Sequence, residues 1–244
     1  MKTLLALCCL AFPAPLALVA VPASAVADEP SKDIIVDGIP LLIPAPPGFV
    51  PVTSDMEPYA SALSNLGNDA DIMMAGFLTV ADAAIVRRGK MPVHEHRAYV
   101  QRLALLTERD TSLKDFSTLK RYTISIFEAR TAKYGGKMSD VDKPLRHPRP
   151  DADILTAKPE ITNFFAFPLH YETENAMAFS LWKKCVVDGV NSQQLEFDQV
   201  VTSTVLLVKG KVLFLFVTGD KADLQWTRTT ARKWAAKVTA ANPS

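Results

Sequence analysis

The sequence lacks an excess of charge of either sign, and it contains few glycines. Its 244 residues include 27 Lys and Arg against 26 Asp and Glu, so the basic surplus typical of nucleic-acid-binding domains is missing. Only ten residues are glycine, and the Gly-x-Ser-x-Gly elbow, the Gly-rich phosphate loop, the dinucleotide-binding Gly-x-Gly-x-x-Gly and the zincin His-Glu-x-x-His are all absent. The sequence therefore gives no support to the enzyme classes that these motifs define, and it implies no cofactor. The apolar share of 48% and the charged share of 22% are those of a globular protein.

The amino terminus has the features of a secretory signal peptide. Lys2 precedes an apolar stretch from Leu4 to Ala20, and the small residues of Ala23–Ala27 follow it. Prolines interrupt this stretch, which is also shorter than the roughly 20 residues that a membrane anchor needs. We expect cleavage after Ala25 or Ala27. The sequence thus predicts a secreted or periplasmic protein with a signal peptide at residues 1–27 and no transmembrane span after cleavage.

Cysteine is also scarce. Cys8 and Cys9 lie in the predicted signal peptide, so the remaining chain keeps only Cys185 and cannot form an intramolecular disulfide. Cys185 belongs to an alternating apolar run. The residues on its face of that run are Met177, Phe179 and Leu181. This pattern favours a buried core thiol over a catalytic thiolate, because only Lys183 and Lys184 stand beside it in the sequence to lower its pKa.

The first part of the remaining chain predicts a hairpin and a helix. Residues 34–43 form two short apolar runs around Asp37-Gly38, which supplies the positive-φ turn of a β-hairpin. The segment 44–49 is rich in proline and extended, and we expect it to line a sheet edge with Phe49 inserted into the core. Ser54 or Asp55 is then expected to begin a helix that runs to about Leu66.

The middle of the chain predicts one strand and two helices. Residues 72–80 are expected to form a strand, while residues 81–90 fit either its extension or a short helix. Pro92 is expected to open a helix to about Glu108. Ser112 and Asp115 have the spacing of a capping box before a further helix that reaches about Phe127.

The last third predicts the core of the fold. Alternating runs occupy residues 163–169, 176–187, 194–208 and 212–217. Asp188-Gly189 and Lys209-Gly210 provide turns between the last three runs, which therefore form an antiparallel meander. A final helix from about Ala222 to Ala240 presents one apolar face. We expect a single α+β domain over residues 28–244, an antiparallel β-sheet covered by helices, with the C-terminal helix packed on the β-meander.

A proline-rich excursion is predicted at about residues 136–159. It contains the basic residues Lys143, Arg146 and Arg149 between acidic neighbours, and it is longer than an ordinary connection. One interpretation is a solvated, locally neutralised loop. The other is a contact with an envelope protein, a lipid headgroup or an anionic polymer, for which Arg146 and Arg149 are suited because guanidinium groups pair well with carboxylate or phosphate.

The sequence His94-Glu95-His96 resembles half of a metal-ligand set. On a strand the two histidines would share a face, but on the helix predicted to begin at Pro92 they diverge by about 200°. We therefore predict that no metal is bound.

The order of these elements resembles that of a known superfamily. An early hairpin is followed by Pro46-Pro47-Gly48-Phe49, a helix, central strands, and a long strand pair ending in a helix that contains Trp226 and Trp234. This layout is similar to that of the PsbP/Mog1/DcrB-like superfamily of small α/β/α sandwich proteins, over most of residues 34–241. Its members act mostly as accessory or binding proteins and share no catalytic residues, so the resemblance implies a non-enzymatic role.

Two hypotheses for function follow. The first is an exported accessory or binding protein of the cell envelope, with Lys143, Arg146, Arg149 and Phe49 as candidate binding residues and no catalytic residues. The alternative is an envelope hydrolase whose acid and base groups meet only in the folded protein. Its candidate groups are Glu172, Glu174, His94, His96 and His170.

Overall fold

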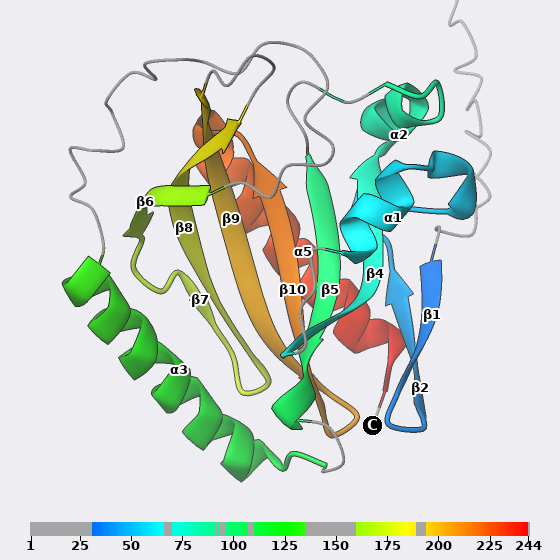
Figure 1. Ribbon diagram of the computed structural model, residues 1–244. Helices are drawn as coiled ribbons and strands as arrows, with labels where there is room; N and C mark the ends of the chain where they lie inside the picture. The colour runs from blue at the N-terminus through cyan, green and yellow to red at the C-terminus, as the bar shows by residue number, and fades with distance from the viewer. Residues whose placement is uncertain are drawn as a thin grey trace, which may run out of the picture.

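The computed structural model describes residues 31–65, 70–90, 92, 96–106, 110–134, 160–188 and 194–243. Its main sheet is antiparallel (Figure 1). The strands are β3 (Phe49–Pro51), β4 (Asp71–Thr79), β5 (Arg97–Leu103), β6 (Glu160–Ala166), β7 (Tyr171–Glu172), β8 (Ala176–Asp188), β9 (Gln194–Val208) and β10 (Lys211–Gly219). Their order across the sheet is β3-β4-β5-β10-β9-β8-β6, and β7 also pairs with β8. The predicted meander of the last three strands and the α+β class are both confirmed.

A separate hairpin precedes this sheet, as predicted. Strands β1 (Ser31–Val36) and β2 (Ile39–Pro44) are joined by Asp37 and Gly38, whose φ angles of 49° and 81° fit the tight turn. The inner face of the hairpin is buried in the largest apolar cluster. Its residues are Ile34, Val36, Leu41 and Ile43. The hairpin thus covers part of the main sheet instead of extending it, and β3 after the proline-rich segment forms the sheet edge.

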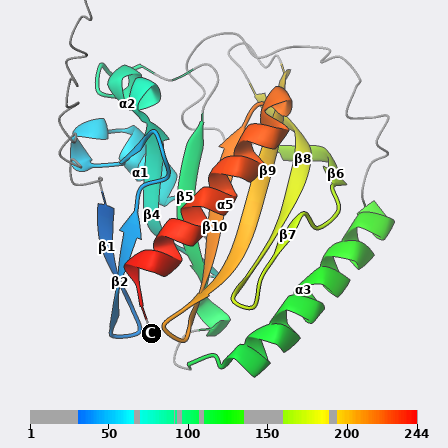
Figure 2. The ribbon, with the colours of Figure 1, turned by 180° about the vertical axis from the view of Figure 1, so that it is seen from behind.

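The C-terminal helix α5 (Leu224–Ala241) crosses the sheet diagonally on what we call the back face (Figure 2). Ala231, Trp234 and Val238 on this helix are fully buried against the sheet and the hairpin. Trp234 Nε1 donates a hydrogen bond of 2.7 Å to the carbonyl oxygen of Pro44. Just beyond the helix, the side-chain amide of Asn242 accepts from Leu42 N at 3.0 Å and donates to Leu42 O at 2.7 Å. The end of the chain therefore completes the edge of β2.

The opposite, front face carries the other helices. Helix α3 (Leu113–Tyr134) buries Phe116 against apolar residues of β8, β9 and β10, and its Phe127 ring lies 4.3 Å from that of Phe179. Ser112 Oγ accepts from Asp115 N at 3.1 Å, which confirms the predicted cap. Two short helices, α1 (Tyr59–Ser64) and α2 (Val80–Val86), pack beside β4. None of the helices in the described ranges has the length and hydropathy that a membrane span requires.

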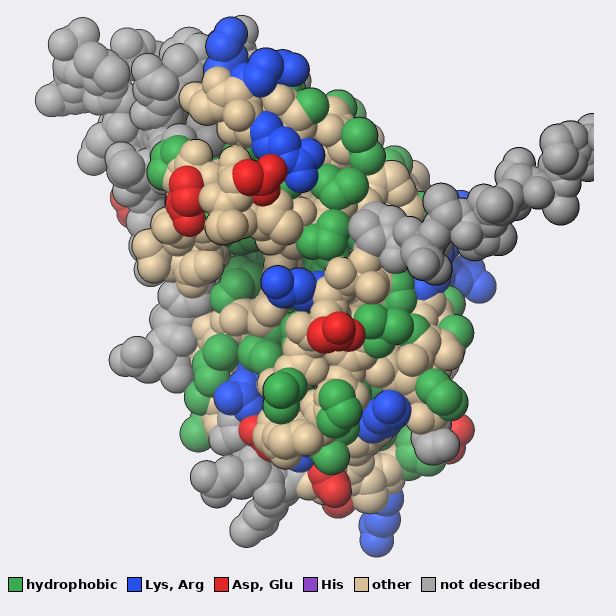
Figure 3. Space-filling model, turned by 90° about the vertical axis from the view of Figure 1, so that its right-hand side faces the viewer, with side chains coloured by type: hydrophobic (Ala, Val, Ile, Leu, Met, Phe, Trp, Pro, Cys, Tyr) green, Lys and Arg blue, Asp and Glu red, His purple; other side chains and the backbone are tan. Residues whose placement is uncertain are grey.

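The short helices lie on the side of the molecule shown in Figure 3. Lys and Arg side chains gather there at the end occupied by α2. Arg87, Arg88 and Lys90 follow this helix and are all exposed. Arg87 Nε forms an ion pair of 2.8 Å with Asp55 Oδ2, so part of this basic charge is neutralised.

The prediction of a helix from Pro92 to about Glu108 is wrong. Strand β5 occupies its centre, and a short 3₁₀ turn, η2 (Ala104–Leu106), follows. Ala98 and Val100 are fully buried, whereas Tyr99 and Gln101 between and after them are only partly buried. Because β5 pairs with β4 on one edge and β10 on the other, tertiary hydrogen bonding outweighs a weak helical pattern.

The helix predicted from Ser54 or Asp55 to about Leu66 is interrupted. A 3₁₀ turn, η1 (Ser54–Met56), precedes α1, and Glu57-Pro58 separates them. Proline has no N–H with which to continue a helix, and it disfavours helical conformation in the residue before it. The signal peptide, the excursion at 136–159 and the turn residue Gly189 lie outside the described residues.

Candidate functional site

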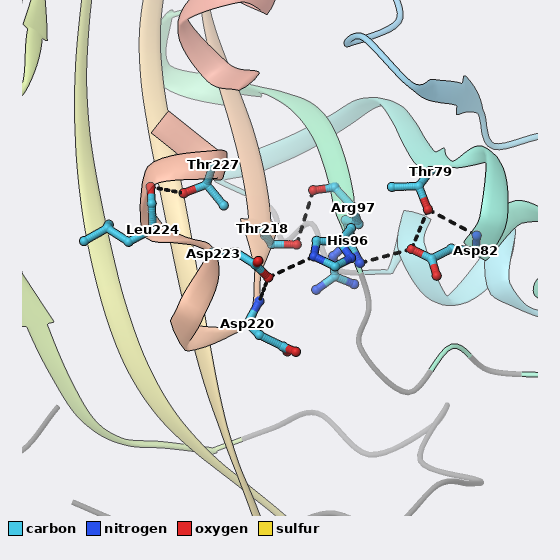
Figure 4. A network of polar contacts seen from close by, with 9 residues as sticks. All are labelled: Thr79, Asp82, His96, Arg97, Thr218, Asp220, Asp223, Leu224 and Thr227. Carbon is cyan, nitrogen blue, oxygen red and sulfur yellow. Dashed lines mark hydrogen bonds and ion pairs between the residues drawn. The ribbon is translucent and has the colours of Figure 1, made fainter. Parts of the chain in front are cut away.

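One polar network joins the start of β5 to α2 and to the turn before α5 (Figure 4). His96 donates from Nε2 to Asp223 Oδ2 at 2.9 Å and from its backbone N–H to Asp82 Oδ2 at 3.2 Å. Asp82 also accepts the Thr79 hydroxyl at 2.8 Å, and Asp223 also accepts the Asp220 N–H at 2.8 Å. Both carboxylates thus combine a local hydrogen bond with a bond to another element. This network fixes three segments relative to one another.

Trp226 covers the same network on its apolar side. Its ring centroid lies 4.7 Å from that of His96 and 6.0 Å from that of Phe49. Phe49 is 3% exposed, so this candidate binding residue lies in the core, where the proline-rich segment was expected to insert it. A Cβ on Gly219 would lie 2.9 Å from Asp223 Oδ2, so a residue without a side chain is needed beside this carboxylate. The tight packing and the hydrogen bonds between the three segments indicate that this network has a structural role.

A second polar cluster lies where the first half of α5 crosses β8 (Figure 2). Arg228 Nε donates to Ser180 Oγ at 3.2 Å, and the Arg228 guanidinium lies over the Phe167 ring, 5.4 Å from its centroid. His170 Nε2 lies 3.2 Å from the same Ser180 Oγ. Ser180 is fully buried, whereas Arg228 and His170 are partly exposed. We call Arg228, His170, Ser180 and Phe167 the Arg228 cluster.

The hydroxyl groups beneath the Arg228 cluster determine the tautomer of His170. Thr227 donates its single hydroxyl proton to Leu224 O at 3.0 Å, so it accepts the proton of Thr202 at 2.9 Å. Thr202 must then accept from Ser180, which lies 2.9 Å away. Ser180 has no second proton, so it accepts from both Arg228 Nε–H and His170 Nε2–H. Neutral His170 is therefore protonated on Nε2, and Nδ1 carries a free lone pair.

The electrostatics of this cluster are those of an uncompensated cation. Burial, followed by the positive charge of Arg228, lowers the pKa of His170 to about 4. Burial also lowers the pKa of Arg228 itself. At neutral pH the cluster therefore consists of a neutral imidazole beside a guanidinium cation. In the part of the chain that the structure describes, Arg228 has no hydrogen bond or ion pair to a carboxylate.

Arg232 is a second arginine on α5 without a carboxylate partner among the described residues. It follows Arg228 by one helical turn and is exposed, and its guanidinium lies over the Tyr171 ring, 5.5 Å from the centroid. No described carboxylate forms an ion pair with it. The adjacent acid Glu172 is engaged elsewhere, because Lys120 Nζ donates to it at 2.9 Å.

An open cleft of about 700 Å³ lies elsewhere, between α1 and β4. Met73, Met74 and Leu63 provide apolar walls, and Ser61 and Ser64 provide hydroxyl groups. The Ser61 hydroxyl donates to Glu57 Oε1 at 2.9 Å and the Ser64 hydroxyl donates to Ala60 O at 3.0 Å, so these polar groups are already paired and the cleft has less chemical definition than the Arg228 cluster.

Cys185 is a buried free thiol, as predicted, with 2% of its surface exposed. Burial raises the pKa of this thiol to about 11, although the nearby Lys183 acts in the opposite direction. Burial also lowers the pKa of Lys183. Cys185 is therefore a protonated thiol at neutral pH and has little nucleophilic character.

Among the residues that the structure describes, the predicted acid and base groups do not meet. The candidate residues Lys143, Arg146, Arg149 and His94 lie outside the described residues. His96 binds Asp223, His170 binds Ser180, and Glu172 binds Lys120. Glu174 lies beyond the end of β7, so it does not share a strand face with Glu172. Among the described candidates, no hydrogen bond or ion pair joins two of them.

The helical geometry on which the metal prediction depended is also wrong. His96 immediately precedes a strand and not a helical turn, so helical divergence no longer separates it from His94. Within the described ranges, His, Cys, Asp and Glu form no group of three that could hold a metal ion. Because His94 is outside those ranges, the absence of a bound metal stays a prediction.

Comparison with protein-family models and with curated proteins finds no match to this chain. The function must therefore be inferred from the Arg228 cluster and its neighbours. Sequence reasoning named His170 but missed Arg228 and Arg232. The sequence did offer one signal for them: two arginines four residues apart lie on the same side of the predicted final helix, next to its apolar face.

Proposed function

We propose that this protein is an exported, non-enzymatic binding protein, and that the Arg228 cluster holds an anionic group of its ligand. The single observation that carries the proposal is a partly buried, well-anchored Arg228 that no described carboxylate compensates. The signal-like amino terminus and the absence of catalytic motifs support the exported and non-enzymatic parts. An anionic group in the envelope, on a lipid or a polymer, has the required chemistry.

The geometry of Arg228 suits an anion. Its Nε–H is held by Ser180 and one face of its plane lies over Phe167, so its orientation is set before a ligand arrives. The terminal N–H groups have no hydrogen-bond partner among the described residues, and a guanidinium fork binds carboxylate or phosphate through two parallel bonds. Partial burial strengthens such a bond relative to one in bulk water.

The test is calorimetric titration of orthophosphate into the protein purified from an exporting host. We expect saturable binding that Arg228→Gln weakens by at least about tenfold, because a charge-assisted hydrogen-bond pair is lost. Lys233→Gln is the matched control: it removes one positive charge from the same helix at an exposed position. Equal weakening by both variants, or no binding by the wild type, would refute the proposal.

A further inference from the structure

Two arginine–aromatic pairs stand one after the other at this site. Arg228 lies over Phe167 at 5.4 Å, and Arg232 lies over Tyr171 at 5.5 Å. The two arginines are four residues apart on α5, and the two aromatic residues are also four residues apart, with Phe167 just after β6 and Tyr171 at the start of β7. The two pairs therefore repeat the same contact along the helix axis.

The spacing of the two arginines is set by the helix, and the two aromatic residues are held by the sheet. With a rise of about 1.5 Å per helical residue, four residues place the Cα atoms of Arg228 and Arg232 about 6 Å apart along α5. The opposing segment is attached to β8, since Phe167 N donates to Ser180 O at 3.0 Å and His170 N donates to Ala178 O at 3.2 Å. The aromatic rings are thus carried by backbone that the sheet holds in place.

The local charge favours more than one anionic group. Arg228 and Arg232 form no ion pair with a described carboxylate, and the only acid in β7, Glu172, is bound to Lys120. Two like charges at a spacing of four residues repel each other on a helix. A single anion bound at Arg228 leaves Arg232 uncompensated, whereas a ligand with successive anionic groups neutralises both.

We infer that the ligand is a linear polyanion whose successive anionic groups bind Arg228 and Arg232 in turn. This inference rests on the proposed function and specifies its ligand class. A chain of phosphates and a chain of carboxylates share this chemistry, because guanidinium binds both in the same bidentate manner. Arg228, which Ser180 and Phe167 hold in place, binds the first anionic group. Arg232, which is more exposed, binds the next one and so favours longer ligands.

The experiment compares short and long anions at constant ionic strength. Orthophosphate and tripolyphosphate form one calorimetric series, and glutamate and tetraglutamate form the other. We expect the longer member of at least one series to bind about tenfold more tightly than the shorter, as a second charge-assisted contact predicts. A gain with phosphate only, or with glutamate only, supports the inference and assigns the source of the ligand.

Variants separate this inference from the proposed function. Arg232→Gln should remove most of the gain with length and leave the affinity for the short anion within about twofold, while Lys233→Gln should preserve the gain. Arg228→Gln should weaken short and long anions alike, and Arg228→Lys provides a second variant that retains the charge but loses the fork. Thermal unfolding of each variant establishes that it is folded.

Two outcomes overturn the inference. One is the absence of a length gain in both series, and the other is an equal loss of that gain in Arg232→Gln and Lys233→Gln, which would indicate a general charge effect. Either result, with short-anion binding still dependent on Arg228, leaves the proposed function intact. If short-anion binding is independent of Arg228, the proposed function itself fails.

Discussion

Two buried threonines on the back face of β9 provide a sharp test of the hydroxyl network. Thr202 and Thr204 are both fully buried, two residues apart, and point toward the same side of the sheet. Thr202 Oγ1 lies 2.9 Å from Ser180 Oγ and 2.9 Å from Thr227 Oγ1, whereas Thr204 Oγ1 has no hydrogen-bond partner in the described part of the chain. Substitution by valine preserves shape and β-branching at both positions, so only the hydrogen bonding differs.

The expected energies have opposite signs. Thr202→Val removes two buried hydrogen bonds at about 1 kcal/mol each, so the free energy of unfolding should fall by about 2 kcal/mol. Thr204→Val replaces an unsatisfied buried hydroxyl with a methyl group and should raise it by about 1 kcal/mol. For a domain of this size, the resulting gap of about 3 kcal/mol corresponds to about 6–12 °C in Tm.

Chemical denaturation and calorimetry of the two variants measure this gap. Thr202→Ser, which retains the hydroxyl, should recover most of the stability that Thr202→Val loses. A fall of equal size in Thr202→Val and Thr204→Val would refute the reasoning, because it would mean that the network contributes no more than an isolated hydroxyl. The same measurements check the assignment of the Ser180 proton, on which the tautomer of His170 depends.

Four further outcomes are expected. Thr202→Val leaves His170 Nε2 as the remaining acceptor for the Ser180 proton, so nitrogen chemical shifts should show His170 changing from the Nε2–H to the Nδ1–H tautomer; an unchanged tautomer would contradict the proton inventory. Because the pKa of His170 is lowered to about 4 in the folded protein, the unfolded chain takes up its proton first as the pH falls, and stability should decline between about pH 6.5 and 4, less so in His170→Gln. Gly219→Ala should reduce the free energy of unfolding by about 1–3 kcal/mol through its clash with Asp223, and an unchanged Tm would show that the turn adapts without cost. Cys185, with its pKa raised to about 11, should react with a thiol reagent at pH 8 only after denaturation, and rapid reaction of the native protein would mean that the thiol is accessible.

Local patterns in the sequence were sufficient for much of the sheet. The Asp37-Gly38 and Lys209-Gly210 turns predict both hairpins because positive φ angles are a local requirement, and the structure gives 47° at Lys209 and 75° at Gly210. Strand β5 could not be predicted in this way. Its conformation depends on hydrogen bonds to β4 and β10, and β10 lies more than 100 residues away in the chain.

The candidate site was less accessible to sequence reasoning than the fold. His170, Ser180 and Arg228 come from a loop, a strand and a helix, and their contact follows from the angle at which α5 crosses the sheet. The basic residues of the proline-rich excursion could be recognised as a cluster because they are close together in the sequence. Arg228 and Arg232 are distinguished instead by what they lack, a carboxylate partner among the described residues, and such an absence becomes visible only in the folded chain.

The bond between Asn242 and Leu42 has a consequence for the order of events in folding. The two residues are 200 positions apart, so the hairpin is synthesised long before the residue that completes its edge. The indole of Trp234, which binds Pro44 O, is also made late. Until the ribosome has released α5, the apolar side of the hairpin lacks the helix that it packs against in the folded protein. The hairpin can therefore reach its native packing only after α5 and Asn242 have been synthesised.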